Sequence, residues 1–317
     1  MDDGIVWTWG SNLNEGAKTR YSDHLDTSTE NVPDTAIKKA DIDHAAYVAA
    51  GGYFTAAIKE DGSLWTWGFN AYGALGNGID FAVPGEEFMI DSKPYKIMED
   101  VESISLGCSW GMAVKTDGTL WTWGCNDYMC LGTGVEGESC VPVKIMEEVT
   151  AVSAGAYHGL ALKKDGTVWG WGDNYSGQLG EEKGGYVDTP KRLMTDCQKI
   201  FVGYAHTIII KRDGTLYTWG ETRGAPAIDE IEKGATLIGG YNRTTLLSSD
   251  GSLKWYLNDT GAHPVTDSVA QASMYYDHLL VLKEDGSVWA CGDNYYSQLG
   301  DGTNREKDDL VLIYQND

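Results

Sequence analysis

The sequence predicts an all-β fold: a seven-bladed β-propeller of four-stranded antiparallel blades, with six complete repeat units and one half unit. Seven Asp-Gly pairs along the 317 residues are each followed by a β-prone run, and most of these copies lie between an apolar run and a Trp-x-Trp-Gly run. The chain also contains 40 glycines and 12 tryptophans. Many glycines without long polar tracts indicate tight turns, and many tryptophans indicate large packed surfaces. We therefore expect residues 1–317 to form a single propeller domain.

The repeat is visible when the chain is compared with itself. Its hairpins are centred on Asp3, Asp61, Asp117, Asp165, Asp213, Asp250 and Asp285. A spacing of about 35–58 residues, with several strands in each unit, is typical of propeller blades.

Each part of the repeat has a structural interpretation. An Asp-Gly pair between two alternating apolar runs predicts a β-hairpin with a type I′ turn, which needs positive φ at both central residues. Residues i and i+2 of a strand share one face, so Trp65 and Trp67 are expected to point the same way and fill the space between blades. The glycine that follows, such as Gly68, is expected to mark a bend or a close backbone approach.

The two ends of the chain do not form a whole unit. The first copy lacks the strands that precede Asp-Gly elsewhere, and the last ends at LVLIYQND, which corresponds to the outer strand SKPYKIMED of the second copy. Either the seventh blade is completed unusually, or the chain is part of a longer protein. The second interpretation is slightly favoured.

The unit AGAYHGLALKKDGTVWGWGDNYSGQLG at 154–180 resembles the repeat of the regulator of chromosome condensation family. The resemblance covers essentially the whole chain and implies a seven-bladed propeller. It says little about function, because the family includes nucleotide-exchange factors, chromatin readers, ubiquitin-ligase modules, light sensors and secreted enzyme inhibitors.

A candidate binding face follows from the turn that precedes the second strand of each unit, because repetition around an axis gathers such turns at one end of the channel. The candidates there are Tyr53, Trp110, Tyr157, His158, Tyr204, His206, Tyr241, Arg243, Tyr276, Asp277 and His278. Aromatic and Arg side chains are enriched at interface hot spots. For the histidines a structural role is the stronger alternative, since the family uses this position to bond neighbouring backbone.

The long loops are expected on the opposite rim. Their tyrosines, Tyr72, Tyr128, Tyr175, Tyr295 and Tyr296, recur in an N-x-Y turn, which favours a structural role. The loop 78–92 is least like the repeat. It carries Phe81 and Phe88 among acidic residues, and it is either a partner-contacting insert or a loop that folds over its own blade.

The amino-acid composition disfavours several classes of partner and of chemistry. The net charge of −23 repels phosphate backbones and anionic membranes, so neither nucleic acid nor membrane is expected. Six cysteines include no CxxC pair; free thiols are favoured over a disulfide or a metal site within residues 108–140. No nucleophile-elbow, HExxH or P-loop pattern occurs, so no enzyme activity, cofactor or metal is predicted.

These observations favour a non-catalytic, monomeric scaffold that binds a protein partner. Two alternatives remain: a carbohydrate-binding module of a secreted or surface bacterial protein, and a guanine-nucleotide exchange factor for a small GTPase. The compartment is not determined by the sequence, and a secreted or cell-surface fragment is slightly favoured over a cytoplasmic protein.

Overall fold

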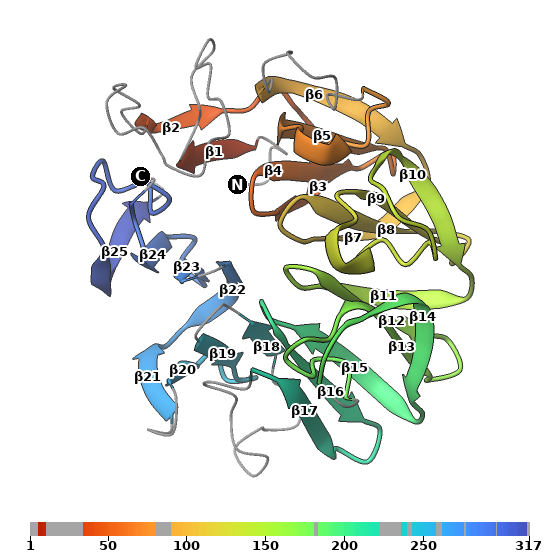
Figure 1. Ribbon diagram of the computed structural model, residues 1–317. Helices are drawn as coiled ribbons and strands as arrows, with labels where there is room; N and C mark the ends of the chain where they lie inside the picture. Colours follow the sequence, from red (N-terminus) through yellow and green to blue (C-terminus); the bar gives the residue numbers. More distant parts are fainter. Residues whose placement is uncertain are drawn as a thin grey trace.

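The computed structural model describes residues 6–10, 34–79, 90–180, 183–221, 236–239, 243–257, 262–275, 277–295 and 297–315. Within them the chain is an all-β propeller whose antiparallel sheets surround a common axis (Figure 1). In each blade the strands follow one another in sequence from the axis outward. No helix in these segments is long and apolar enough to cross a membrane.

Six sheets of three or four strands form the blades. The first three are β3–β6 (Ala45–Ala50, Phe54–Lys59, Leu64–Phe69, Ile90–Met98), β7–β10 (Val101–Leu106, Trp110–Lys115, Leu120–Gly124, Ser139–Met146) and β11–β14 (Val149–Ala154, His158–Lys163, Val168–Asp173, Tyr186–Met194). The others are β15–β17 (Cys197–Val202, His206–Lys211, Leu216–Gly220), β18–β21 (Thr236–Gly239, Arg243–Leu247, Leu253–Leu257, Ala262–Thr266) and β22–β25 (Val269–Tyr275, His278–Lys283, Val288–Gly292, Lys307–Tyr314).

The predicted number of seven blades is wrong for the described chain, which has six. The first copy of the repeat forms only a two-stranded sheet, β1 (Trp7–Gly10) with β2 (Asp34–Lys39), between blades β22–β25 and β3–β6 (Figure 1). The physical reason is that the described residues of the first copy include no strand before β1, so β1 and β2 correspond to the two outer strands of a blade.

The Asp-Gly hairpins also differ from the expected type I′ turn. Gly62 has φ of +79°, whereas Asp61 is not among the residues with positive φ. The Gly62 N–H donates to Lys59 O and the Lys59 N–H to Ser63 O, both at 2.9 Å, which closes a three-residue loop. Such a loop, with glycine last and left-handed, is the other common way to join two strands.

The aspartate of this turn organises the first tryptophan of the motif. Asp117 Oδ1 accepts hydrogen bonds from Thr119 N at 2.9 Å and Thr119 Oγ1 at 2.6 Å, and Trp121 Nε1 donates to Thr119 Oγ1 at 2.9 Å. These hydrogen bonds from Thr119 hold the pKa of Asp117 below its ordinary value. The same chain of contacts recurs at the copies that begin at Asp61, Asp165 and Asp285.

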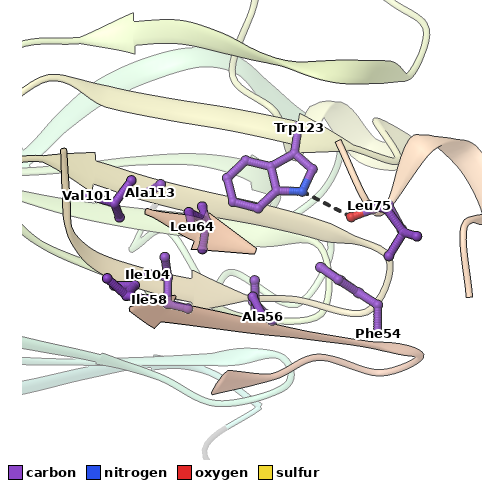
Figure 2. Packing of buried hydrophobic residues seen from close by; sticks show 11 residues of the cluster. Phe54, Ala56, Ile58, Leu64, Leu75, Val101, Ile104, Ala113 and Trp123 are labelled. Carbon is purple, nitrogen blue, oxygen red and sulfur yellow. Dashed lines mark hydrogen bonds between the residues drawn. The ribbon is translucent and has the colours of Figure 1, made fainter. Parts of the chain in front are cut away.

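The second tryptophan of the motif joins adjacent blades, as the alternation predicted. Trp123 is fully buried, packs among residues of blade β3–β6 and donates its indole N–H to Ala74 O at 3.0 Å (Figure 2). Trp171 makes the equivalent bond to Cys130 O at 2.8 Å. In both cases the accepting carbonyl belongs to the residue just before the Leu-Gly pair of the previous blade. The turn that contains this pair therefore contacts the tryptophan of the next blade.

The same contact closes the ring at the two-stranded sheet. Trp9 on β1 donates its indole N–H to Gln298 O, 2.8 Å away in the last blade. A Cβ at Gly300 would lie 2.7 Å from Trp9 Cδ1, so the ring lies directly against the glycine. The N-terminal and C-terminal parts of the chain are thus held together by the contact used between internal blades.

Candidate functional site

The turns before the second strands and the loops after the third strands lie on one face of the propeller, here called the loop face. The ring centroids of Tyr128, from a loop, and Tyr157, from a turn, are 5.1 Å apart. The expected placement of the long loops on the opposite rim is therefore wrong. In an antiparallel blade the first and third connections leave from the same end, while the Asp-Gly hairpins lie at the other end.

Four of the described loops after a third strand are held by an asparagine, which is buried in three of them and partly buried at Asn126. Asn70 Oδ1 accepts from Leu75 N at 2.9 Å, and Asn126 Oδ1 accepts from Leu131 N at 3.0 Å. The same bond recurs from Leu179 to Asn174 and from Leu299 to Asn294. The asparagine and the leucine thus fix the course of each of these four loops, and the tyrosine lies beside them in sequence.

Those tyrosines accordingly face solvent on the loop face. Tyr72, Tyr128, Tyr175 and Tyr295 are all exposed, Tyr128 to 44% and Tyr175 to 56%. A structural role for these tyrosines, expected from their repetition, stays a prediction.

Three of these rings form a cluster across a blade junction, which we call the tyrosine cluster. Tyr128 belongs to blade β7–β10, whereas Tyr157 and Tyr175 belong to blade β11–β14. The ring centroids of Tyr128 and Tyr175 are 5.9 Å apart, with planes at 81°. Burial raises the pKa of Tyr157, the half-buried member. The cluster therefore has one anchored ring and two exposed rings.

The backbone at Tyr128 is left-handed, with φ of 57° and ψ of 22°, and Tyr72 is similar at 58° and 28°. Such a conformation costs a non-glycine residue on the order of 1 kcal/mol, and it often marks functional positions. At both positions an aromatic residue therefore adopts a backbone conformation that would cost glycine less free energy. The left-handed backbone at these tyrosines was not predicted from the sequence, because the hydrogen bond between asparagine and leucine that shapes the turn is seen only in the structure.

Several predicted site residues lie between blades. Trp110 is fully buried and donates to Ala156 O at 2.9 Å. His158 is buried with Nε2 3.2 Å from Thr207 Oγ1, and His206 is buried with Nε2 3.3 Å from Thr244 Oγ1. These side chains contact the next blade, in agreement with the structural alternative for the histidines.

The remaining candidate binding residues do not share one surface. Tyr53 is exposed on the loop face with its ring 6.0 Å from Phe69, and Tyr204 lines the central cavity described below. Asp277 and His278 are half-buried at the start of β23. Arg243 begins β19. Tyr241, Tyr276, Tyr296, Phe81 and Phe88 lie outside the described residues.

Burial of the two histidines predicts an unusual dependence of stability on pH. Desolvation, with a smaller effect of His206, lowers the pKa of His158 to about 3, and desolvation lowers that of His206 to about 4. The unfolded chain takes up protons below about pH 6.5, whereas the folded chain does not. The free energy of unfolding should therefore fall as the pH decreases from 6.5 to 5, with a limiting slope of about 1.4 kcal/mol per pH unit for each histidine.

Urea unfolding at pH 7, 6 and 5 measures this slope. Burial also lowers the pKa of His278, so a His158→Gln variant should lose part of this slope while remaining folded at pH 7. An unchanged slope in that variant would show that other groups cause the acid sensitivity.

The cysteines carry no disulfide: all six are free thiols, as favoured from the sequence. Burial raises the pKa of Cys125 to about 12 and that of Cys130 well above its ordinary value. Thiols of this kind are poor nucleophiles. Among the described residues no group of three or more His, Cys, Asp or Glu side chains is arranged to hold a metal ion.

The axis of the propeller encloses a cavity of about 280 Å³. Its walls are the innermost strands of all six blades, β3, β7, β11, β15, β18 and β22, with Tyr47, Ser105, Ser153, Tyr204 and Met274 among the lining residues. Half of the lining residues are serine, alanine or glycine, and the other half are larger apolar residues and two tyrosines.

Comparison with known proteins agrees with this architecture. Residues 1–230 match the family model of the RCC1-like domain, and residues 269–298 match that of the regulator of chromosome condensation (RCC1) repeat. Human E3 ubiquitin-protein ligase HERC2 is 31% identical over 133 residues, 41% of this chain and 3% of that protein. The Arabidopsis thaliana ultraviolet-B receptor UVR8 is 32% identical over 146 residues, 44% of this chain and 30% of the receptor. The matches thus span a minor part of these relatives.

Solved structures show the same fold at low identity. Prp20p from Saccharomyces cerevisiae, in a structure reported with its binding to Gsp1p and histones, superposes with a TM-score of 0.75 at 17% identity. The superposition covers 99% of this chain and 87% of the Prp20p chain. Human WBSCR16 superposes with a TM-score of 0.74 at 15% identity, and the superposition covers 89% of this chain and 85% of the WBSCR16 chain.

Proposed function

Since the chain belongs to the RCC1-like domain family, we propose that it is a non-catalytic module that binds another protein through its loop face. The observation that carries the proposal is the tyrosine cluster, in which Tyr128 and Tyr175 are exposed and Tyr157 is anchored. Exposed aromatic rings on a rigid scaffold lose little conformational entropy on binding, which is why they recur as interface hot spots.

Charge indicates what the partner's surface carries. The chain has a net charge of −23, and Asp127, Glu136 and Glu138 are exposed close in sequence to Tyr128. Lysine or arginine on the partner would be attracted to this surface and could stack on the tyrosine rings. We expect the association rate to fall steeply when salt is raised.

A photo-crosslinking amino acid at position 128, introduced in cells of the source organism, tests the proposal. The captured protein is then purified, and its affinity is measured by titration calorimetry. Tyr128→Ala and Tyr175→Ala should each weaken binding by about 10- to 30-fold, as hot-spot truncations of about 1.5–2 kcal/mol do. Circular dichroism should be unchanged, because both side chains are exposed.

Tyr217→Ala is the matched control. Tyr217 is also exposed, but it lies on β17 near the Asp-Gly end of its blade. Equal effects of Tyr217→Ala and Tyr128→Ala would contradict the loop face as the interface. A glycan array provides the second control: sugar binding that Tyr128→Ala abolishes would favour the carbohydrate-binding alternative over a protein partner.

A further inference from the structure

The loop that carries Tyr128 has a cysteine at each end of its base, Cys125 and Cys130, and we call this pair the loop thiols. The hydrogen bond that Leu131 donates to Asn126 aligns this loop with the loops after the third strands of blades β11–β14 and β22–β25. In both of those loops an aspartate stands in place of Cys125 and a glutamine in place of Cys130. The contacts of these polar residues therefore indicate how the two cysteines are placed.

In the two other blades the aspartate and the glutamine bridge the base of the loop. Gln178 Nε2 donates to Asp173 Oδ2 at 2.8 Å. Gln298 Nε2 donates to Asp293 Oδ2 at 2.9 Å. The other carboxylate oxygen of Asp173 accepts the backbone N–H of Tyr175 at 2.9 Å. The repeat thus directs the side chains of the first and sixth residues of this loop at each other.

The loop thiols keep this arrangement with sulfur in place of oxygen and nitrogen. Cys125 Sγ accepts the N–H of Asp127 at 3.4 Å, as the aspartate of blade β11–β14 accepts an N–H two residues away. Cys130 Sγ donates to Cys125 O at 3.0 Å. Burial raises the pKa of Cys130, and the nearby Cys125 thiol raises that pKa further. The two sulfur atoms therefore lie close together across the base of the loop.

The other four cysteines are placed differently. Cys197 begins β15 and Cys291 is on β24, and each is the only cysteine of its blade. Cys140 is on β10 and lies against the preceding blade, where a Cβ at Gly73 would be 2.6 Å from Cys140 Cα. Cys108 is buried in the turn before β8. The loop thiols are therefore the pair that the repeat directs at each other.

A disulfide between the loop thiols would change the loop above it. The two Cβ atoms must approach to about 3.5–4.5 Å, closer than an aspartate–glutamine bridge requires. The S–H that Cys130 donates to Cys125 O is lost at the same time. Cys130 cannot simply move with the loop, because its carbonyl accepts the indole N–H of Trp171 in the next blade. The change therefore falls on the left-handed backbone at Tyr128 and Met129.

We propose that Cys125 and Cys130 can be oxidised to a disulfide and that this withdraws Tyr128 from the tyrosine cluster. The oxidant is a small disulfide such as oxidised glutathione. The thiolate of Cys125, which is 3% exposed, attacks one sulfur of the oxidant and releases one reduced thiol. The thiolate of Cys130 then attacks Cys125 Sγ and releases the second, and the two thiol protons end on the two released molecules. The effect on binding rests on the proposed function, whereas the disulfide does not.

Burial sets the rate of this reaction. It raises the pKa of Cys125 to about 12, so the closed loop holds almost no thiolate at neutral pH. Oxidation should take on the order of hours and accelerate about tenfold per pH unit between pH 6.5 and 8, because the thiolate is the attacking species. The loop thiols therefore respond to the lasting redox conditions of a compartment and not to a brief pulse of oxidant.

Thiol counting tests the disulfide without any partner. The chain is incubated with oxidised glutathione at pH 8, unfolded in the presence of an alkylating reagent and mapped by mass spectrometry. The six free thiols should fall by two, with Cys125 and Cys130 joined. A Cys108→Ser variant should also lose two thiols. The chain oxidised in urea serves as the reference for thiols that react without the fold.

The matched variant replaces the loop thiols with the bridge of blade β11–β14, as C125D combined with C130Q. Its loop base is held by a hydrogen bond that this fold already uses, so folding should survive, and it has no thiol there to oxidise. A fluorotyrosine at position 128 reports the surroundings of that ring by fluorine NMR. The signal should shift when the wild type is oxidised, return with dithiothreitol, and stay constant in the matched variant.

Affinity for the partner captured through position 128 gives the functional result. Oxidation should weaken binding to the wild type at least tenfold, and dithiothreitol should restore it. The matched variant should bind equally with and without oxidant. If the reduced chain binds no protein, the proposed function fails, while the thiol count and the fluorine spectrum still decide whether the loop thiols control Tyr128.

Three results would overturn the proposal. The first is a folded chain that keeps all six thiols at pH 8 while the chain in urea loses them. The second is a disulfide that joins another pair, such as Cys108 and Cys125. The third is a disulfide between Cys125 and Cys130 that leaves the fluorine signal unmoved, because the loop would then accept the bond without displacing Tyr128.

Discussion

Replacing Trp123 with alanine should destabilise the propeller by about 3–5 kcal/mol, the usual loss for a fully buried tryptophan. The indole fills the junction between blades β3–β6 and β7–β10, where it packs among Phe54, Leu75 and Ala113 and bonds to Ala74 O. A Cβ at Gly76 would lie 2.8 Å from Trp123 Cδ1, so the backbone is already as close to the ring as it can come. Little relaxation into the cavity is therefore available.

The matched control is Trp121→Ala, two residues earlier on the same strand. Trp121 is only partly buried and bonds to Thr119 within its own hairpin. Its loss should cost about 1–2 kcal/mol. The urea midpoints of both variants, measured at pH 7.5, compare the two costs. Equal losses would show that blade junctions contribute no more to stability than the hairpins do.

The second large effect is expected at the glycine that follows the Trp-x-Trp motif. Gly124 has φ of +101°, and a Cβ there would lie 2.5 Å from Ser109 O and 2.8 Å from Trp110 Cα. Both atoms are backbone or are fixed to it, so they cannot move away as a flexible side chain could. Gly124→Ala should cost about 3 kcal/mol or more, from the strained φ together with the steric overlap.

Gly137→Ala separates these two causes. Gly137 has nearly the same φ, +96°, but a Cβ there would meet nothing within 4 Å. It should cost about 1 kcal/mol, from backbone strain alone. Thermal unfolding followed by circular dichroism measures both variants. A cost at Gly137 equal to that at Gly124 would show that close backbone approach plays no part.

The repeat allowed most of the fold to be predicted because its signals are local. Trp65 and Trp67 share a face of one strand, and Gly68 marks a close backbone approach; each follows from a few adjacent residues. The turn type was wrong because Asp-Gly occurs in two hairpin geometries, which differ by one loop residue. The number of blades was wrong because a seventh complete blade needs two inner strands, and none lies among the described residues of the first copy.

The tyrosine cluster could not be predicted in the same way. Tyr128, Tyr157 and Tyr175 meet only because a loop of one blade and a turn of the next lie at the same end of the propeller. Sequence comparison aligns positions within blades, whereas this contact runs between blades. Burial of Trp110 was hidden for the same reason, since its partner Ala156 is in the following unit.

The bond between Trp9 and Gln298 has a consequence for cooperativity. Blades that contact only their neighbours behave as a chain of coupled units, and such a chain can unravel from either end. Joining the two ends converts the chain into a cycle, in which no unit can be lost without breaking two couplings. Among the described residues one coupling is made by the two strands β1 and β2, so we expect unfolding to begin there.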